Sequence, residues 1–437
     1  KKRFSDFVLN NLNTYSDRYV SAYLNYFRQF QVRIDSRWAL NYVLDQLQQP
    51  NSALLQTLLQ IKNNTALNLP DKPSFKPFAQ KLSAFRFVQR LMQEQNGAYP
   101  EFQKYQAIML QMQNDLDSRE PYMPKKSDDA AGLKAALTPM GRVAWGMLLN
   151  EEGSYSRLVK GWLQNAGIVD YWQQPFLAPV QKVAELGTAE IKQNIDGVWS
   201  DIWNSNVLPL LVKFPLMPDA GRDKELAVDD LIKVFHPKQG VFWATFQQYL
   251  APLCSFGNGV WVKREELTDS LALPSDSLAR LNSAQRLTAT LWDGQGNPKP
   301  LQISVKPELL PAFDRKQIPD APLVSLAYLR SGGFSVLGFN QQAAWQKLTM
   351  EWWTAQPAAV GMEFRKDADP TRVYSDTVVA DSPWNLFRLL QQGQMVENSR
   401  YRWMLAHPDF PQQKLNLEFS FRTDPWKVFT DLAGGWP

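Results

Sequence analysis

The stretch LNLEFSF, residues 415–421, alternates apolar and polar side chains without a break. Leucine or phenylalanine occupies every odd-numbered position, and asparagine, glutamate and serine occupy the positions between them. Because successive side chains of a β-strand point to opposite faces of its sheet, this alternation predicts a strand with one buried and one exposed face. The C-terminal part of the chain is therefore expected to contain a sheet that covers an apolar core.

Further short runs of this kind fill residues 285–437. Residues 287–292 and 301–305 both alternate and flank the turn sequence DGQGNP at 293–298, which predicts a β-hairpin. One helix is expected among the strands, with Ser382 as its N-cap and Gly393 just past its end. This pattern predicts an antiparallel β-sandwich with one inserted helix. The other expected strands are Leu323–Leu329, Phe334–Phe339, Trp345–Trp353, Val360–Phe364, Arg372–Val379 and Tyr401–Leu405.

The first two thirds of the chain repeat apolar residues at helical spacing. An aromatic stripe along residues 15–30 is interpreted as core-facing, and Ser52 is expected to cap a helix. Residues 118–132, SREPYMPKKSDDAAG, read as a linker or long loop, and the proline-rich segment 208–221 as an irregular surface crossing. We therefore predict an α+β multidomain chain whose three domains are an all-α domain at 1–120, a second helical domain at 121–284 and the β-sandwich at 285–437.

The composition excludes several kinds of site. The chain has 437 residues but only 2 His and 1 Cys, too few for an intrachain disulfide, a cysteine-rich zinc site, an iron–sulfur cluster or a three-histidine metal site. Both histidines precede proline and are interpreted as structural or exposed. Cys254 is expected to be a small buried apolar residue.

Charge and hydropathy argue against nucleic acid and membrane spans. The net charge is 47 − 43 = +4, and no basic stripe interleaved with aromatic residues is visible, so no nucleic-acid partner is expected. A membrane-spanning helix needs about 20 apolar residues, and the apolar runs are much shorter. The chain begins at Lys1 rather than Met, and we interpret it as a piece of a longer protein.

No motif points to chemistry. The chain contains no GxxxxGK[ST] phosphate loop and no GxGxxG before a helix, and the nearest serine-elbow lookalike, residues 333–338, lies among expected strands. Acidic pairs such as Asp229-Asp230 are adjacent and would diverge on a helix rather than face each other. We therefore predict no catalytic, cofactor-binding or metal-binding residues, and no enzymatic activity.

The partner-binding candidates are aromatic. Trp352 and Trp353 are consecutive in an expected strand, so their side chains should leave opposite faces, although a sandwich buries only one. One of them must be covered by a neighbouring domain, a loop or a partner protein. Trp292 raises the same question, and Asn297 is expected at an accessible hairpin tip. The predicted partner-binding residues are Trp292, Asn297, Trp352 and Trp353.

Several blocks of sequence resemble the TssM (IcmF-like) family of type VI secretion systems. They are Phe214-Pro215, DLIKVF at 230–235, GVFWATFQQYLAPL at 240–253, SPWNLFRLL at 382–390, and Asp424-Pro425-Trp426 after the last strand. The family's helix begins Gly-Pro-Trp where this chain has Ser382, a mild departure because serine also caps helices.

The resemblance implies the periplasmic region of a bacterial inner-membrane protein. In that family, helical domains precede a β-rich domain that binds the outer-membrane lipoprotein TssJ, and copies of TssM assemble with TssL into the envelope-spanning complex. The resemblance thus implies a scaffold that links the inner and outer membranes, without catalysis or cofactor.

One alternative comes from a different class of protein. A helical domain followed by a sandwich, with 16 Trp in the chain, also suits a periplasmic carbohydrate-active enzyme or sugar-binding protein. That alternative predicts a long cleft lined by tryptophan and tyrosine, with two converging carboxylates or a tyrosine–arginine–carboxylate set.

Overall fold

The computed structural model describes residues 2–29, 34–66, 72–124, 128–267, 269–309, 323–339, 343–366, 369–397, 399–407, 410–422 and 426–434. The chain divides into two compact units: unit 1 comprises Lys1–Gly197 and Lys263–Ala272, and unit 2 comprises Val198–Val262 and Leu273–Pro437. These units are defined by contacts, whereas a domain is defined by its ability to fold independently. The division into three domains at residues 120 and 284 therefore stays a prediction.

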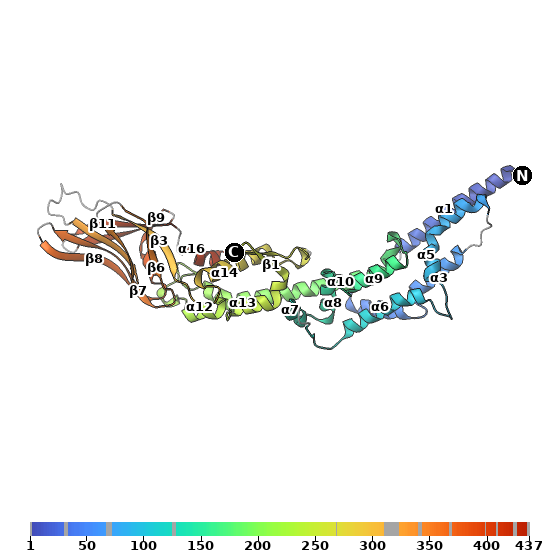
Figure 1. Cartoon of the computed structure of the whole chain (residues 1–437), viewed down its shortest axis with the longest axis horizontal. Helices are drawn as coiled ribbons and strands as arrows, with labels where there is room; N and C mark the ends of the chain where they lie inside the picture. The colour runs from blue at the N-terminus through green and yellow to red at the C-terminus, as the bar shows by residue number, and fades with distance from the viewer. Residues whose placement is uncertain are drawn as a thin grey trace. The chain divides into compact units, whose positions relative to one another are not determined.

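Unit 1 is helical, as predicted (Figure 1). Ser52 caps α3, since its Oγ accepts a hydrogen bond from the backbone N–H of Leu55 at 3.2 Å. The helices are α1 (Lys2–Gln29), α2 (Arg37–Gln48), α3 (Ala53–Thr65), α4 (Lys76–Leu82), α5 (Arg86–Leu91), α6 (Pro100–Asp117), α7 (Ala131–Ala136), α8 (Pro139–Leu148), α9 (Tyr155–Asn165) and α10 (Asp170–Ile202), of which the last residues belong to unit 2.

An aromatic cluster forms the core of unit 1. The Tyr105 ring lies 5.0 Å from that of Trp162, and its hydroxyl donates to the carbonyl of Phe176 at 3.1 Å. The stripe on α1 contributes less than predicted: Phe27 is buried, whereas Tyr15 and Tyr26 are exposed. Tyr23 still packs against the core, with its ring 5.8 Å from that of Phe85, so the stripe is core-facing in part. Phe30 lies outside the described residues.

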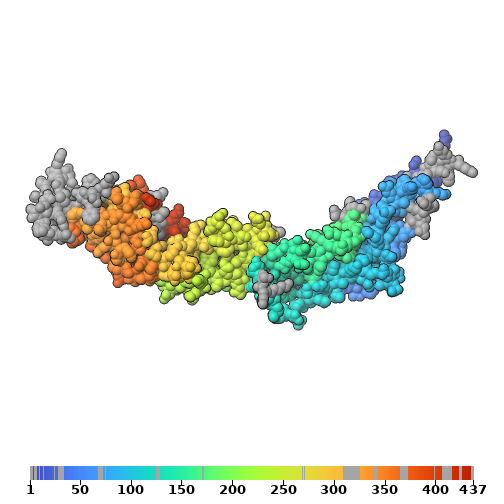
Figure 2. Space-filling view, in the orientation of Figure 1, coloured from blue at the N-terminus to red at the C-terminus, as the bar shows by residue number. Residues whose placement is uncertain are grey.

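Unit 2 begins with helices, continues with sheets and ends with the short helix α16. In Figure 2 its yellow-green helices and orange strands form one continuous surface. The helices are α11 (Leu208–Leu211), α12 (Val228–Phe235), α13 (Val241–Thr245), α14 (Ser275–Leu291), α15 (Asn385–Gln392) and α16 (Lys427–Gly434), and the two-stranded sheet pairs β1 (Cys254–Gly257) with β2 (Val260–Lys263), whose last residue belongs to unit 1.

Two larger antiparallel sheets follow, in contact with each other through β5 and β6 and through β8 and β10. Their described strand orders are β6-β3-β11-β10-β9 and β5-β4-β7-β8. This confirms the predicted fold class: helices first, antiparallel sheets last, and α15 inserted between strands. The strands are β3 (Leu301–Leu309), β4 (Leu323–Ser331), β5 (Phe334–Phe339), β6 (Gln346–Met350), β7 (Gln356–Lys366), β8 (Asp369–Ser382), β9 (Gln394–Glu397), β10 (Arg400–His407) and β11 (Phe410–Phe421).

The stretch that alternates at 415–421 lies in β11, as predicted. Leu417 and Phe419 are buried, and Phe419 pairs with Tyr401 of β10. Glu418 lies between them on the opposite face but is only 3% exposed. Its carboxylate forms ion pairs with Arg402 and, at 4.0 Å, with Arg400. The polar face of this strand is thus covered by arginine side chains rather than by water.

The predicted hairpin at 287–305 is wrong in its first half. Residues 275–291 form α14, whose buried residues Leu281, Ala284, Leu287 and Leu291 recur every three or four positions. Taken alone, residues 287–292 fit both the two-residue period of a strand and the 3.6-residue period of a helix. The helical period becomes clear only when the residues before them are included. The turn at 293–298 is present: the Asp293 carboxylate accepts from the backbone N–H of Asn297 at 2.8 Å.

The strand expected at 345–353 ends earlier, at Met350, so Trp352 and Trp353 lie in a turn instead of on opposite faces of a strand. Trp352 is 0% exposed. Its ring lies 5.3 Å from that of Trp292, and its indole N–H donates to the carbonyl of Lys299 at 2.8 Å. The cover that the sequence required is therefore supplied by the chain itself.

Removal of the Trp352 ring should destabilise unit 2 far more than removal of its neighbour. We expect Trp352→Ala to lower the free energy of unfolding by about 3–5 kcal/mol, the usual range for a large buried aromatic. Trp353→Ala should cost clearly less, because Trp353 is only half-buried. Urea unfolding followed by tryptophan fluorescence measures both; equal losses would contradict the burial described here.

Candidate functional site: the Arg388 junction

A loop from the helical part of unit 2 forms one side of the site. It runs from Phe214 to Leu226 and closes on itself, because Phe214 donates to the carbonyl of Lys224 and Leu226 donates to that of Phe214, both at 2.8 Å. The Phe214–Pro215 peptide bond is cis. The irregular surface crossing predicted at 208–221 is right in part: the segment begins with α11, continues irregularly, and buries Phe214 and Leu216 while Met217 is exposed.

Helix α15 forms the other side of the site. Strand β8 continues to Ser382, so the helix begins at Asn385, after the predicted N-cap. Ser382 still satisfies a backbone donor, since its Oγ accepts from the N–H of Trp384 at 3.0 Å. Gly393 follows the end of the helix, as predicted. Every residue from Asn385 to Leu390 is buried, which places the helix between other parts of the unit rather than on its surface.

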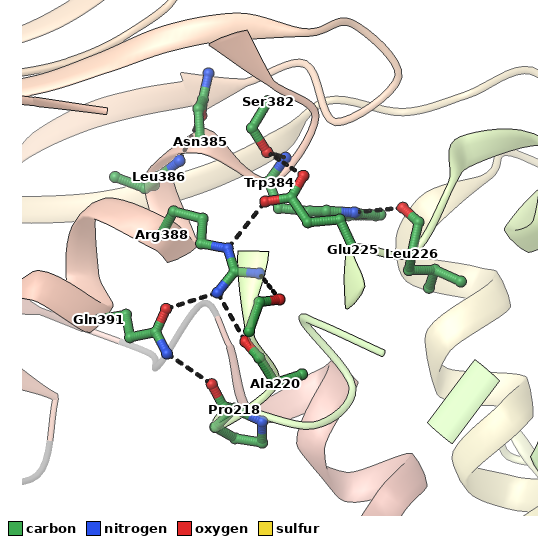
Figure 3. Close-up of polar contacts among 11 residues, drawn as sticks. Pro218, Ala220, Glu225, Leu226, Ser382, Trp384, Asn385, Leu386, Arg388 and Gln391 are labelled. Atoms are coloured by element: carbon green, nitrogen blue, oxygen red, sulfur yellow. Dashed lines mark hydrogen bonds and ion pairs between the residues drawn. The ribbon is translucent and has the colours of Figure 1, made fainter. Parts of the chain in front are cut away.

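The guanidinium of Arg388 lies at the centre of the site and is shown in Figure 3. Its side chain is only 4% exposed. Nε donates to Glu225 Oε1 at 2.9 Å, and the two terminal nitrogens donate to the carbonyls of Ala220 at 3.0 Å and Gly221 at 2.9 Å. The guanidinium carbon lies 3.6 Å from the centroid of the Phe214 ring. A buried cation is tolerated only with such compensation, so Arg388 fixes this loop against α15.

Neighbouring polar contacts extend the same junction. The second oxygen of Glu225 accepts from Ser382 Oγ at 3.0 Å. Gln391, one turn along α15, accepts from Arg388 at 2.8 Å and donates to the carbonyl of Pro218 at 2.9 Å. The Glu225–Ser382 and Gln391–Pro218 bonds join the sheet part to the loop, whereas the Arg388–Gln391 bond lies within α15 and orients the arginine (Figure 3).

The indole N–H groups of two tryptophans form further hydrogen bonds across the junction. The N–H of Trp384 donates to the carbonyl of Leu226 at 2.7 Å, and that of Trp426 donates to the carbonyl of Pro215 at 3.0 Å. The Trp426 ring lies 5.3 Å from the Phe214 ring and 6.0 Å from the Phe387 ring. Such aromatic contacts add apolar burial to directed hydrogen bonds.

Three of the five blocks that resemble TssM therefore meet at one place. Phe214-Pro215, Ser382 to Arg388, and Trp426 are far apart in the sequence and form one connected set of contacts. The block at 240–253 has a separate structural reason: a Cβ at Gly240 would lie 2.5 Å from the Val234 carbonyl oxygen. Only glycine fits that turn between α12 and α13.

The predicted partner-binding residues are placed differently from one another. Trp292 and Trp352 are buried, in contact with each other, whereas Trp353 is half-buried and Asn297 is exposed. The Asn297 amide donates to the Asp293 carboxylate at 3.1 Å, so the loop tip is ordered by its own side chains. Their role in partner binding stays a prediction, with exposed surface available only at Trp353 and Asn297.

Other residues that the sequence singled out are structural. His236 Nδ1 accepts from the backbone N–H of Lys238 and of Gln239, each at 3.1 Å. Burial raises the pKa of the Cys254 thiol to about 12, which makes it inert. Among the described residues, no group of three or more His, Cys, Asp or Glu could hold a metal ion, and no helix combines the length and apolarity that membrane crossing demands.

Replacing Arg388 tests the junction directly. Arg388→Ala should lower the free energy of unfolding of unit 2 by about 3–5 kcal/mol, because it leaves a carboxylate and two carbonyls without their buried donor. The matched control is Arg286→Ala, which removes a 53% exposed arginine whose ion pair with Asp431 spans 3.9 Å; its cost should be about 1 kcal/mol or less. Urea unfolding measures both, and a small loss for Arg388→Ala would contradict its central place.

Comparison with known proteins finds solved structures with a similar fold. No family model and no curated protein matches the chain. A solved structure described as a type VI secretion system membrane core complex contains a chain that is similar over 98% of this chain and 85% of its own length, with a TM-score of 0.63 and 16% identity.

Two further structures are similar. One, described as a type VI membrane complex, covers 96% of this chain and 77% of its own chain, with a TM-score of 0.57 and 17% identity. The other, described as the C-terminal domain of the T6SS protein TssM from EAEC, covers 54% of this chain and 94% of its own, with a TM-score of 0.35 and 17% identity. Over nearly its whole length, the chain therefore has the fold of a component of a type VI secretion membrane complex, as the resemblance of its motifs to the TssM family predicted.

Proposed function

We propose that this chain is the periplasmic scaffold portion of a TssM-like inner-membrane protein. On this proposal it binds the outer-membrane lipoprotein TssJ through its β-rich part, assembles with TssL and with other copies of itself, and so links the two membranes. The observation that carries the proposal is the shared fold, helices first and sheets last, over 98% of the chain.

The Arg388 junction supports a mechanical role over a catalytic one. Its buried cation, with carboxylate and carbonyl partners, joins two parts of unit 2. A scaffold that connects two membranes has to transmit displacement from helices to sheets without a soft joint between them. We propose on this basis that the chain acts without catalysing a reaction.

The sheets offer surface for a protein partner. Strand β9 is the described edge of its sheet, and all four of its residues are exposed. Large apolar side chains are exposed on both sheets, at Val378 of β8, Met395 of β9 and Met404 of β10. Exposed apolar residues and a free strand edge are features of protein interaction surfaces. The alternative, a carbohydrate-active or sugar-binding protein, has no comparable observation in its favour.

Hydrogen–deuterium exchange of the full chain, with and without the TssJ protein moiety, tests the proposal. Bound TssJ should slow amide exchange within residues 301–421 and leave residues 2–197 unchanged. Val378→Lys and Met404→Lys introduce charge on exposed positions of the two sheets, and at least one should weaken binding about tenfold or more.

The control variant is Val169→Lys, which changes an exposed valine of unit 1 in the same way. It should leave TssJ affinity unchanged. Protection confined to residues 2–197, or no binding by the folded chain, would overturn the assignment of the β-rich part as the TssJ site.

A further inference from the structure

A hollow in unit 1 is bordered by Ser118 and by Glu120 to Met123, residues of the expected linker that follows α6. Figure 1 shows where α6 and α7 lie in the fold. The hollow consists of two adjoining cavities of about 410 and 430 Å³. Both cavities are lined by Tyr122, Arg142, Glu151 and Glu152. A few hundred Å³ is the lower range of pockets for small ligands.

Tyr122 forms a fixed wall of the hollow. Its hydroxyl donates to the carboxylate of Asp128, and its ring lies between two cations, with Lys134 Nζ 6.0 Å and the Arg142 guanidinium carbon 5.9 Å from the centroid. Lys134 in turn is paired with Asp128 at 3.4 Å and with Glu151 at 3.0 Å. Tyr122 and Asp128 are thus held by a closed set of contacts with Lys134 and Glu151 that uses these charges.

Two side chains of opposite charge that line the hollow, Arg142 and Glu152, form no ion pair within that set. Among the residues that the structure describes, Arg142 has no carboxylate at ion-pair distance, and its guanidinium donates only to the carbonyl of Glu120, at 3.4 Å. Glu152, an exposed residue at the rim of the hollow, has no hydrogen-bond or ion-pair partner among the described residues. Both line the two cavities, yet they do not pair with each other.

We propose that this hollow binds a small zwitterion, an amino acid or short peptide whose free carboxylate contacts Arg142 and whose free amine contacts Glu152. A purely anionic ligand would face Glu151 and Glu152, and a purely cationic one would face Arg142 and Lys134. The apolar lining by Pro121, Pro139 and Val143 suits the aliphatic part of such a ligand.

Calorimetric titration of the full chain with three matched dipeptide probes tests the proposal. Glycyl-leucine carries both charges, N-acetylglycyl-leucine lacks the amine, and glycyl-leucine amide lacks the carboxylate. We expect the first to bind and each capped probe to bind about tenfold more weakly, as for the loss of one charge-assisted contact.

The variants assign each charge to its residue. Arg142→Gln should weaken the binding of glycyl-leucine about tenfold and leave the binding of the amide probe, which lacks the carboxylate, unchanged. Glu152→Gln should likewise weaken the binding of glycyl-leucine and leave that of the acetylated probe, which lacks the amine, unchanged. Lys192→Gln, an exposed change elsewhere in unit 1, is the control, and circular dichroism checks that each variant is folded. Lack of binding up to about 10 mM, equal binding of capped probes, or unchanged binding by both variants would overturn the proposal.

Discussion

The buried guanidinium of Arg388 is the interaction on which the architecture of unit 2 depends. A cation removed from water is strongly unfavourable unless its donors are satisfied, and here they meet one carboxylate, one side-chain amide and two backbone carbonyls. Three of those four acceptors belong to the loop that ends at Leu226. Because α15 supplies the arginine and the loop supplies most of the acceptors, neither can take its place without the other.

The aromatic residues around Arg388 make this junction part of a continuous core. Trp384 stacks on Trp352 with ring centroids 6.4 Å apart, and Trp352 contacts Trp292 at the end of α14. A contact path therefore leads from α14 through three indole rings to α15 and the loop. A unit built in this way should respond to force as one body, which is the property that the proposed scaffold role requires.

The sequence predicted local structure well and long-range contacts poorly. The strand at 334–339 has the bounds that were predicted, because they are set by its own local pattern. The helix at 275–291 was missed because its last five positions also alternate, and the helical period appears only over a longer window. Two short strands, β1 and β9, gave no periodic signal, since their exposed residues do not alternate.

The junction itself could not be predicted from local patterns. Arg388 and Glu225 are 163 positions apart, and both arginine and glutamate are residue types that usually lie on the surface. The motif resemblance did single out Phe214, Trp384, Arg388 and Trp426, but it could not tell that they meet. The argument about Trp352 and Trp353 assumed that both lie on a strand, whereas they lie in a turn, where Trp292 and Trp384 cover Trp352.

Native-state hydrogen exchange tests most directly whether the helices and sheets of unit 2 form one cooperative body. The informative amides are those of Leu231 in α12, Leu389 in α15 and Leu417 in β11, all fully buried. The account predicts that their opening free energies agree within about 1 kcal/mol and fall together as denaturant is added. An α12 that opens several kcal/mol more readily than β11 would contradict it, because the Arg388 junction would then not couple the two parts.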